Sequence, residues 1–281
     1  MTGLRSAVSC YDKIFEKASS NKYNLSIRLI SDGLFFTIYD TETHKYIGFE
    51  SDIMTGITEV YDSVRNNQLF AGRFRNTVCV IPASKYTLVP DALFLPDRAT
   101  EYLSFVHEIH PGEDVSTSNL LSTDAVVVYA SEMGYFELIR ECFPSAKVIP
   151  MVTSLIDLVV PAFRNSADPV MCIHLNRNDF DVLLIQNGNM VYCNNFSYSN
   201  AEDLVYFTIF VIDQLKINVE KVKAFLSGDI NVKSDVMRLI RKYVRTVNIL
   251  NVDNQAQVSY ALNEIQVHNF PDLFNPRLCE L

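Results

Sequence analysis

The densest group of residues able to hold a metal ion lies in the stretch "FVHEIHPGED", which contains two histidines and three acidic residues. His107 and His110 are three positions apart, so both imidazoles could share a helix face and bind zinc together with a carboxylate. Pro111 and Gly112 follow directly and end any such helix. The H-E-x-x-H spacing of zinc proteases is missing. We therefore interpret this stretch as a surface helix end.

Two polar clusters follow strand-like runs in the two halves of the chain. The first comprises Ser31, Asp32 and Gly33, and the second runs from Asn176 to Asp179. Asp32 and Asp179 could face a common cleft. They could equally be ordinary turn residues, because Asp, Asn and Gly tolerate positive φ and hydrogen-bond their own backbone. We favour the turn interpretation.

The elements around these clusters occur twice in the same order. Each copy has three strands, a helix and a further strand, at 24–31, 34–40, 46–51, 55–69 and 77–83, and again at 169–175, 180–186, 190–196, 200–215 and 221–228. Asn187-Gly188 separates two strands of the second copy and predicts a type I′ hairpin. The offset of about 145 residues indicates a duplicated α/β architecture.

The order of elements and the loop spacing resemble the actin-like ATPase superfamily, whose ribonuclease H-like lobes occur in actin, heat-shock ATPases and sugar kinases. The pilus-assembly and cell-division members look nearest, as does an uncharacterised bacterial family. The resemblance implies two lobes, each a mixed sheet with a three-stranded antiparallel start flanked by helices. We assign residues 1–165 to the first lobe and 166–281, with a C-terminal tail, to the second.

In that superfamily each lobe opens with a strand that ends Asp-x-Gly. The glycine lets the backbone approach the phosphates, and the aspartate orients hydrated magnesium or the attacking water. Counting back from the second-lobe hairpin places these positions at His174 and Asn176, and the equivalent first-lobe positions at Arg28 and Ile30. The chain therefore departs from the superfamily at both carboxylates and both glycines, which puts ATP hydrolysis in doubt.

The resemblance also implies a glycine-ended strand against which adenosine packs. Here "FLSGDI" retains Ser227 and Gly228, which would equally suit a plain strand-to-helix turn. The candidate residues of a degenerate nucleotide cleft are Arg28, Ser31, Asp32, Gly33, His174, Asn176, Asp179, Ser227 and Gly228. We predict no catalytic residue and no metal site.

Composition narrows the classes of partner and compartment. The net charge of −9 argues against nucleic acid or an anionic membrane as the main partner, since both reward clustered Lys and Arg. The basic run from Lys233 to Arg245 is interpreted as a solvated helix face. The six cysteines are far apart and form no CxxC pair, and the N-terminus lacks the apolar stretch of a signal peptide. These features favour a cytoplasmic protein.

The leading hypothesis is a non-catalytic protein-interaction or scaffold protein that needs no cofactor. Its partner is expected to be a protein, with homo-oligomers also possible. The alternative is a nucleotide-binding protein or slow ATPase that uses Mg-ATP with Asp32, Asp179 and Gly228. A third is an unrelated enzyme involving His174.

Two apolar segments raise separate expectations. The stretch "VYFTIF" has the pattern of a buried helix. The tail, with Phe270, Leu273, Phe274 and Leu278, could dock on its own lobe or on another protein. Self-docking is the expected arrangement, because an exposed apolar strip is a liability.

Overall fold

The computed structural model describes residues 7–231, 233–251 and 257–279, whose strands form two large sheets and a small one. The first sheet has the order β1 (Val8–Tyr11), β4 (Lys45–Ile53), β3 (Gly33–Asp40), β2 (Tyr23–Ile30), β5 (Asn76–Ile81) and β9 (Lys147–Pro150), with β15 (Gln257–Val258) beside β4. The second has the order β12 (Asn189–Ser197), β11 (Asp179–Gln186), β10 (Val170–Leu175), β13 (Lys223–Gly228) and β14 (Thr246–Ile249). The small sheet contains β6 (Lys85–Pro90), β8 (Ala125–Glu132) and β7 (Glu113–Asn119).

The helices fill the connections between these strands. They are α1 (Ile57–Asn66), α2 (Ala99–Ser104), α3 (Met133–Cys142), α4 (Met151–Phe163), α5 (Ala201–Gln214) and α6 (Asp235–Ile240). Short 3₁₀ turns occupy Lys17–Lys22, Asp91–Leu93, Pro96–Arg98, Tyr260–Leu262, Val267–Asn269 and Pro276–Cys279. No helix in the described ranges has both the length and the apolar character needed to cross a membrane.

The two large sheets repeat one topology, as the sequence predicted. The order β4-β3-β2-β5-β9 in the first sheet matches β12-β11-β10-β13-β14 in the second. In each, an antiparallel three-stranded start is followed by a helical crossover to a strand parallel to the first one. The duplicated α/β fold class is thereby confirmed. The proposed lobe boundary at residue 165 falls between α4 and β10 and stays a prediction.

The hairpin between β11 and β12 has the conformation predicted from Asn187-Gly188. Both residues have positive φ, 53° and 78°, as a type I′ turn requires. Gly188 is needed for a second reason, since a Cβ there would lie 2.4 Å from the carbonyl oxygen of Arg164. The turn therefore fixes the register of the second sheet and allows it to approach the end of α4.

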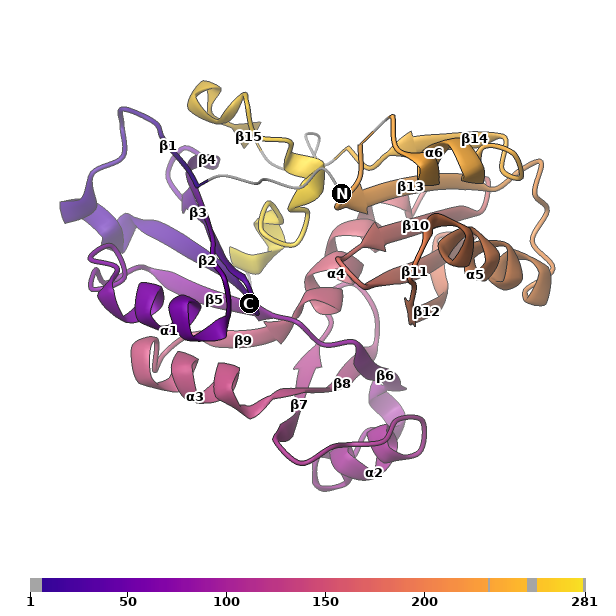
Figure 1. Ribbon diagram of the computed structural model, residues 1–281, viewed down its shortest axis with the longest axis horizontal. Helices are drawn as coiled ribbons and strands as arrows, with labels where there is room; N and C mark the ends of the chain where they lie inside the picture. Colours follow the sequence, from indigo (N-terminus) through magenta and orange to yellow (C-terminus); the bar gives the residue numbers. More distant parts are fainter. Residues whose placement is uncertain (1–6, 232, 252–256, 280–281) are drawn as a thin grey trace.

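Helix α4 lies between the two large sheets, while the small sheet with α2 lies below both (Figure 1). Alternate residues of β10 face opposite ways. Val170 and Cys172 belong to the core that includes α4 and the first sheet, whereas Met171 and Ile173 belong to the core under α5 and α6. Each face of the second sheet is thus covered by helices.

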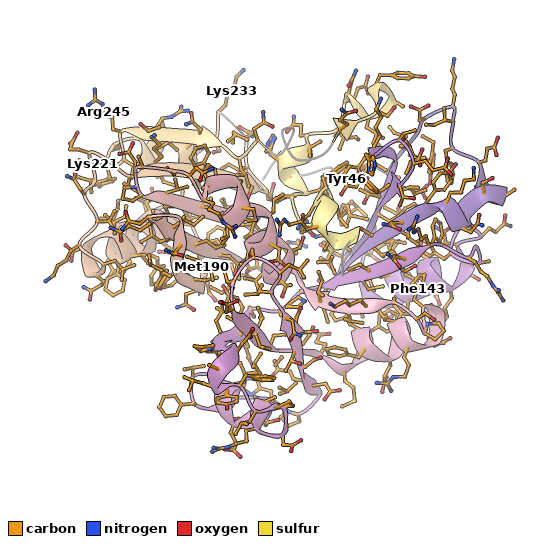
Figure 2. All side chains as sticks on the ribbon, turned by 180° about the vertical axis from the view of Figure 1, so that it is seen from behind. Tyr46, Phe143, Met190, Lys221, Lys233 and Arg245 are labelled. Atoms are coloured by element: carbon orange, nitrogen blue, oxygen red, sulfur yellow. The ribbon has the colours of Figure 1, made fainter. Side chains whose placement is uncertain are left out.

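The C-terminal tail packs mainly on the first sheet, and His268 also contacts the second lobe, with its Nε2 3.3 Å from the carbonyl oxygen of Ile230. Strand β15 pairs with β4, and the ring of Phe274 lies 4.9 Å from that of Tyr46, the residue labelled beside the tail in Figure 2. Phe270 packs 5.0 Å from Phe49. The reason is aromatic packing, because the face of β3 and β4 presents rings that would otherwise stay exposed. Docking within the chain is confirmed, and the assignment of the tail to the second lobe stays a prediction.

We predict that the tail contributes strongly to stability. Phe274→Ala should lower the free energy of unfolding by about 3–5 kcal/mol, because the ring is fully buried and its loss leaves a cavity. Urea unfolding followed by circular dichroism would measure this. Phe105→Ala is the matched control, since that ring is 91% exposed and its loss should change stability by less than about 0.5 kcal/mol. Equal effects for both variants would contradict the packing described here.

Candidate functional site

A cavity of about 300 Å³ lies where the carboxyl ends of β2, β5 and β10 meet the small sheet. Its walls include five of the nine candidate cleft residues: Arg28, Ser31, Asp32, Asn176 and Asp179. Gly33, His174, Ser227 and Gly228 do not line it. The volume is at the lower end of the range for small-molecule sites.

The two positions expected to hold aspartates are equivalent in the two sheets. Arg28 pairs with Val80, the next-to-last residue of β5, and His174 pairs with Ser227, the next-to-last residue of β13. Neither side chain can take the role of a magnesium-orienting carboxylate, because one is a cation and the other is a buried imidazole.

Arg28 is held by the tail and by an aromatic ring. Its Nη1 lies 3.3 Å from Oδ1 of Asp272, and its guanidinium lies 5.6 Å from the centroid of Phe35. Asp272 is fully buried, and burial raises the pKa of its carboxyl even though the charge of Arg28 acts in the opposite direction. The first-lobe position therefore carries a positive charge engaged in packing the tail.

His174 is fully buried beside the start of α4 and does not line the cavity. Its Nδ1 lies 3.0 Å from Oγ of Ser227 and its Nε2 lies 3.2 Å from Sδ of Met151. Burial, followed by the nearby charge of Arg28, lowers the pKa of His174 to about 3. The imidazole is thus neutral at physiological pH and Ser227 is its hydrogen-bond partner, so neither contacts a molecule in the cavity.

Gly228 serves strand packing. Its φ is +82°, and a Cβ there would lie 2.1 Å from the carbonyl oxygen of Leu175 on the adjacent strand β10. The amide of Asp229 donates to that same carbonyl at 2.8 Å. The glycine is therefore required by the close approach of two strands. Gly33 is also buried, and a Cβ there would lie 2.8 Å from the ring of Phe35.

The two polar clusters meet across the mouth of the cavity. Arg177, from the turn after β10, forms an ion pair with Asp32, from the turn after β2. Asn176 and Asp179 close their turn on themselves, by a backbone bond of 2.9 Å and a side-chain bond of 2.8 Å. Arg177 is 69% exposed, so the ion pair with Asp32 adds little stability, although it joins the two lobes.

Asp181 is a functional candidate that the sequence analysis missed. Its Oδ1 accepts from the hydroxyl of Tyr86 at 2.9 Å and from Nδ2 of Asn195 at 3.0 Å. Asn195 also donates to Asp179. Burial, together with the charge of Asp179, raises the pKa of Asp181 to about 7. The available signal was an acidic residue within the otherwise apolar run 180–185.

Another wall of the cavity comes from the small sheet. Lys85 Nζ lies 2.8 Å from both carboxylate oxygens of Glu113 and donates to the carbonyl of Glu108. Glu132 completes this side. Cationic and anionic groups in the cavity are thus mostly paired with one another.

The structure offers no metal site within the described ranges, where no three His, Cys, Asp or Glu residues come together in a suitable arrangement. His107 and His110 lie beyond the end of α2. Nε2 of His107 is 3.1 Å from the carbonyl oxygen of Tyr86, whereas His110 is exposed beside Glu108. The residues at the positions equivalent to the superfamily's carboxylates therefore do not fit magnesium.

The basic run does not contribute to the cavity. Lys233 and Arg245 project outward from the periphery of the second lobe, as does Lys221 (Figure 2). None of the three lines the cavity. The interpretation of this run as a solvated face agrees with its position.

Comparison with known proteins places this geometry in context. A family profile described as "Protein of unknown function (DUF3822)" matches residues 12–247. No curated protein matches the chain. A Bacteroides thetaiotaomicron protein described as having an actin-like ATPase fold and unknown function superposes with a TM-score of 0.79 at 23% identity, covering 90% of this chain and 100% of its own.

A second solved structure is more distant. The PilM–PilN type IV pilus biogenesis complex gives a TM-score of 0.60 at 10% identity, covering 91% of this chain and 95% of the matched chain. At these identities the likeness concerns the fold alone. The chain has an actin-like ATPase fold, as the resemblance predicted.

We predict that Asp181 makes stability depend on pH. Because its folded-state pKa, about 7, exceeds the ordinary value of 3.8, the native state keeps a proton that the unfolded state releases. Stability therefore falls as pH rises from about 4 to 7, by at most about 1.4 kcal/mol per pH unit. Asp181→Asn keeps the acceptor oxygen and removes the titration, so its stability relative to wild type should be greater at pH 8 than at pH 5.

Urea unfolding at both pH values would measure the difference between wild type and variant. Asp97→Asn, at an exposed position, serves as the control and should show the same difference from wild type at both. If the free energy of unfolding of Asp181→Asn relative to wild type does not increase between pH 5 and pH 8, Asp181 is not protonated in the native state.

Proposed function

The chain belongs to the DUF3822 family of proteins of unknown function, and we propose that it is a non-catalytic protein-binding or scaffold protein with a degenerate actin-like cleft. The observation that carries the proposal is the pair of residues at the magnesium-orienting positions, Arg28 and His174. Arg28 holds the buried carboxylate of Asp272, and His174 is a neutral core residue. A fixed cation at one position repels magnesium, and a buried imidazole whose nitrogens face Ser227 and Met151 provides no ligand at the other.

The loss of these carboxylates lowers the rate of ATP hydrolysis more than it changes the fold. Removing one preorganised electrostatic group from an active site commonly costs about 2.7–4 kcal/mol of barrier, or roughly 100- to 1000-fold in rate. Two such losses, with most charged groups of the cavity already paired, support a chain whose fold is retained for another purpose. No cofactor is required for that purpose.

A protein partner is supported by fold-level analogy and by charge. PilM, which shares the fold, is described in a complex with PilN. The net charge of −9 disfavours nucleic acid. We propose the cytoplasm as the location, supported by the isolated cysteines.

The alternative is a nucleotide-binding protein. It is favoured by the cavity of about 300 Å³ and by the buried Oδ1 of Asn176, which has no hydrogen-bond partner within the described residues. In that case Asp32 and Asp179 would contact the ligand in a geometry different from the superfamily's.

A titration with Mg-ATP distinguishes the two functions. We expect no heat in a calorimeter and no shift in melting temperature at millimolar nucleotide. A ligand present at 100 times its Kd would stabilise the protein by about 2.7 kcal/mol, and thus raise the melting temperature by roughly 5–10 °C.

The variants Asp32→Asn and Asp179→Asn sharpen the titration. Micromolar binding by wild type that weakens in both variants would overturn the scaffold proposal in favour of the nucleotide function. Mg-ATP binding that neither substitution changes would indicate a nucleotide site outside this cavity.

A further inference from the structure

Helix α5 has an outward face that the sequence analysis did not anticipate. The helix is capped by Asn200, whose side chain accepts from the amide of Asp203 at 2.8 Å, and it buries Leu204, Val211 and Ile212 against the second sheet. The stretch "VYFTIF" was predicted to be buried. Tyr206 is instead 63% exposed and Phe210 is 44% exposed.

These rings belong to a groove of about 460 Å³ between α5 and the end of α6. Its lining residues are Glu202, Val205, Tyr206, Ile209, Phe210 and Asp213 of α5, with Leu239 and Tyr243 from the second helix and the turn after it. The α5 members recur at the three- and four-residue spacing of one helix face. Tyr243 is 55% exposed, so three aromatic rings are presented to solvent together.

The composition and shape of the groove suit a helix. Amphipathic helices bind by laying an apolar face into a groove, with contacts repeated every three or four residues. Aromatic residues are enriched among those that carry most of the binding energy at protein interfaces. Tyr206 and Phe210 are stacked, with ring centroids 6.3 Å apart, and form a preformed contact surface.

The charged residues of the groove indicate which charges the partner helix should carry. The two charged residues that line the groove, Glu202 and Asp213, are both acidic and stand at opposite ends of the α5 face, about 16 Å apart along the helix. Of the neighbouring cations, Arg238 is paired with Asp235 at 2.8 Å and Lys242 does not line the groove. A ligand with a positive charge at each end of its apolar face would pair with both carboxylates.

The same charges argue against two other occupants. If a second copy of the chain docked through this face, α5 would meet α5 either parallel or antiparallel. In both cases acidic residues would lie opposite acidic residues. An anionic membrane surface would be repelled by Glu202 and Asp213 for the same reason.

We propose that the groove between α5 and α6 binds an amphipathic helix of a partner protein, with Lys or Arg at both ends of its apolar face about three turns apart. This inference rests on the proposed protein-binding function and gives it a surface and a partner chemistry. The site is separate from the cavity between the lobes, since no residue lines both.

A displayed library of helices tests the proposal on the full chain. Each helix would have about 18 residues, a fixed leucine face and randomised residues at the ends and on the outer face. Selection on wild type, with counter-selection on Phe210→Ala, should enrich Lys or Arg at both ends of the leucine face. The best peptide should then lose roughly tenfold or more in affinity for Tyr206→Ala and Phe210→Ala, measured by fluorescence anisotropy.

Two further variants test whether binding depends on the groove and on its two acidic residues. Phe105→Ala, at an exposed ring outside the groove, is the matched control and should bind like wild type. The double variant Glu202→Lys/Asp213→Lys should weaken the basic peptide by roughly two- to fivefold per charge and favour a Glu-ended version of it.

The possible results distinguish a failure of the groove proposal from a failure of the proposed protein-binding function. Enrichment without basic ends, or affinity that does not depend on Tyr206 and Phe210, would overturn the proposal. So would concentration-dependent dimers abolished by Phe210→Ala in sedimentation, or binding to vesicles of anionic lipid that needs Phe210. Mg-ATP binding in the earlier titration would overturn the proposed function itself, whereas failure of the helix selection overturns only this surface.

Discussion

The burial of α4 between two sheets is the constraint on which the rest of the molecule depends. Every residue from Met151 to Val160 is buried, so this part of the helix has no solvated face, and it belongs to the core shared by the first sheet and the inner face of the second. Its few polar groups must find partners inside the protein. The hydroxyl of Ser154 donates to the carbonyl of Asp272, and Asp157 accepts from the amides of Leu121 and Ser122 at 2.9 Å.

The cleft follows from that constraint. Since α4 fixes the two sheets against each other, the carboxyl ends of β2 and β10 must face one another across its first turn, whatever residues they carry. In this chain those residues have become structural: Arg28 secures the tail and His174 packs on Met151 at the start of α4. The strands around the cleft can therefore keep this arrangement without the residues that carry out chemistry in proteins of similar fold.

What the sequence predicted well was local. Asn187-Gly188 fixed a hairpin through turn chemistry, and from that hairpin the order of strands in both copies could be counted. The destination of the tail was not predictable, because the contacts of Phe270 and Phe274 are with residues more than 200 positions away and leave no periodic signal. The strand pairing of Asp181 with His174, and its contact with Tyr86, were hidden for the same reason.

Helix α5 shows a different limit. Apolar residues on all sides of a helix predict burial, but the pattern is the same whether the covering surface belongs to the chain or to another molecule. Tyr206 and Phe210 are apolar in sequence and exposed in the structure. For the candidate site, Arg28, Asp32 and Asn176 line the cavity, whereas the burial of His174 depends on a strand face that a shift of one residue would reverse.

The return of the tail to the first sheet has a consequence for synthesis on the ribosome. Domains usually fold in the order in which they emerge, but the aromatic face of β3 and β4 is covered by Phe270 and Phe274 from the end of the chain. At about 5–20 residues per second, the stretch from residue 166 to the tail takes roughly 5–20 s to translate. During that interval the nascent first sheet presents rings that remain uncovered until Phe270 and Phe274 have emerged from the ribosome.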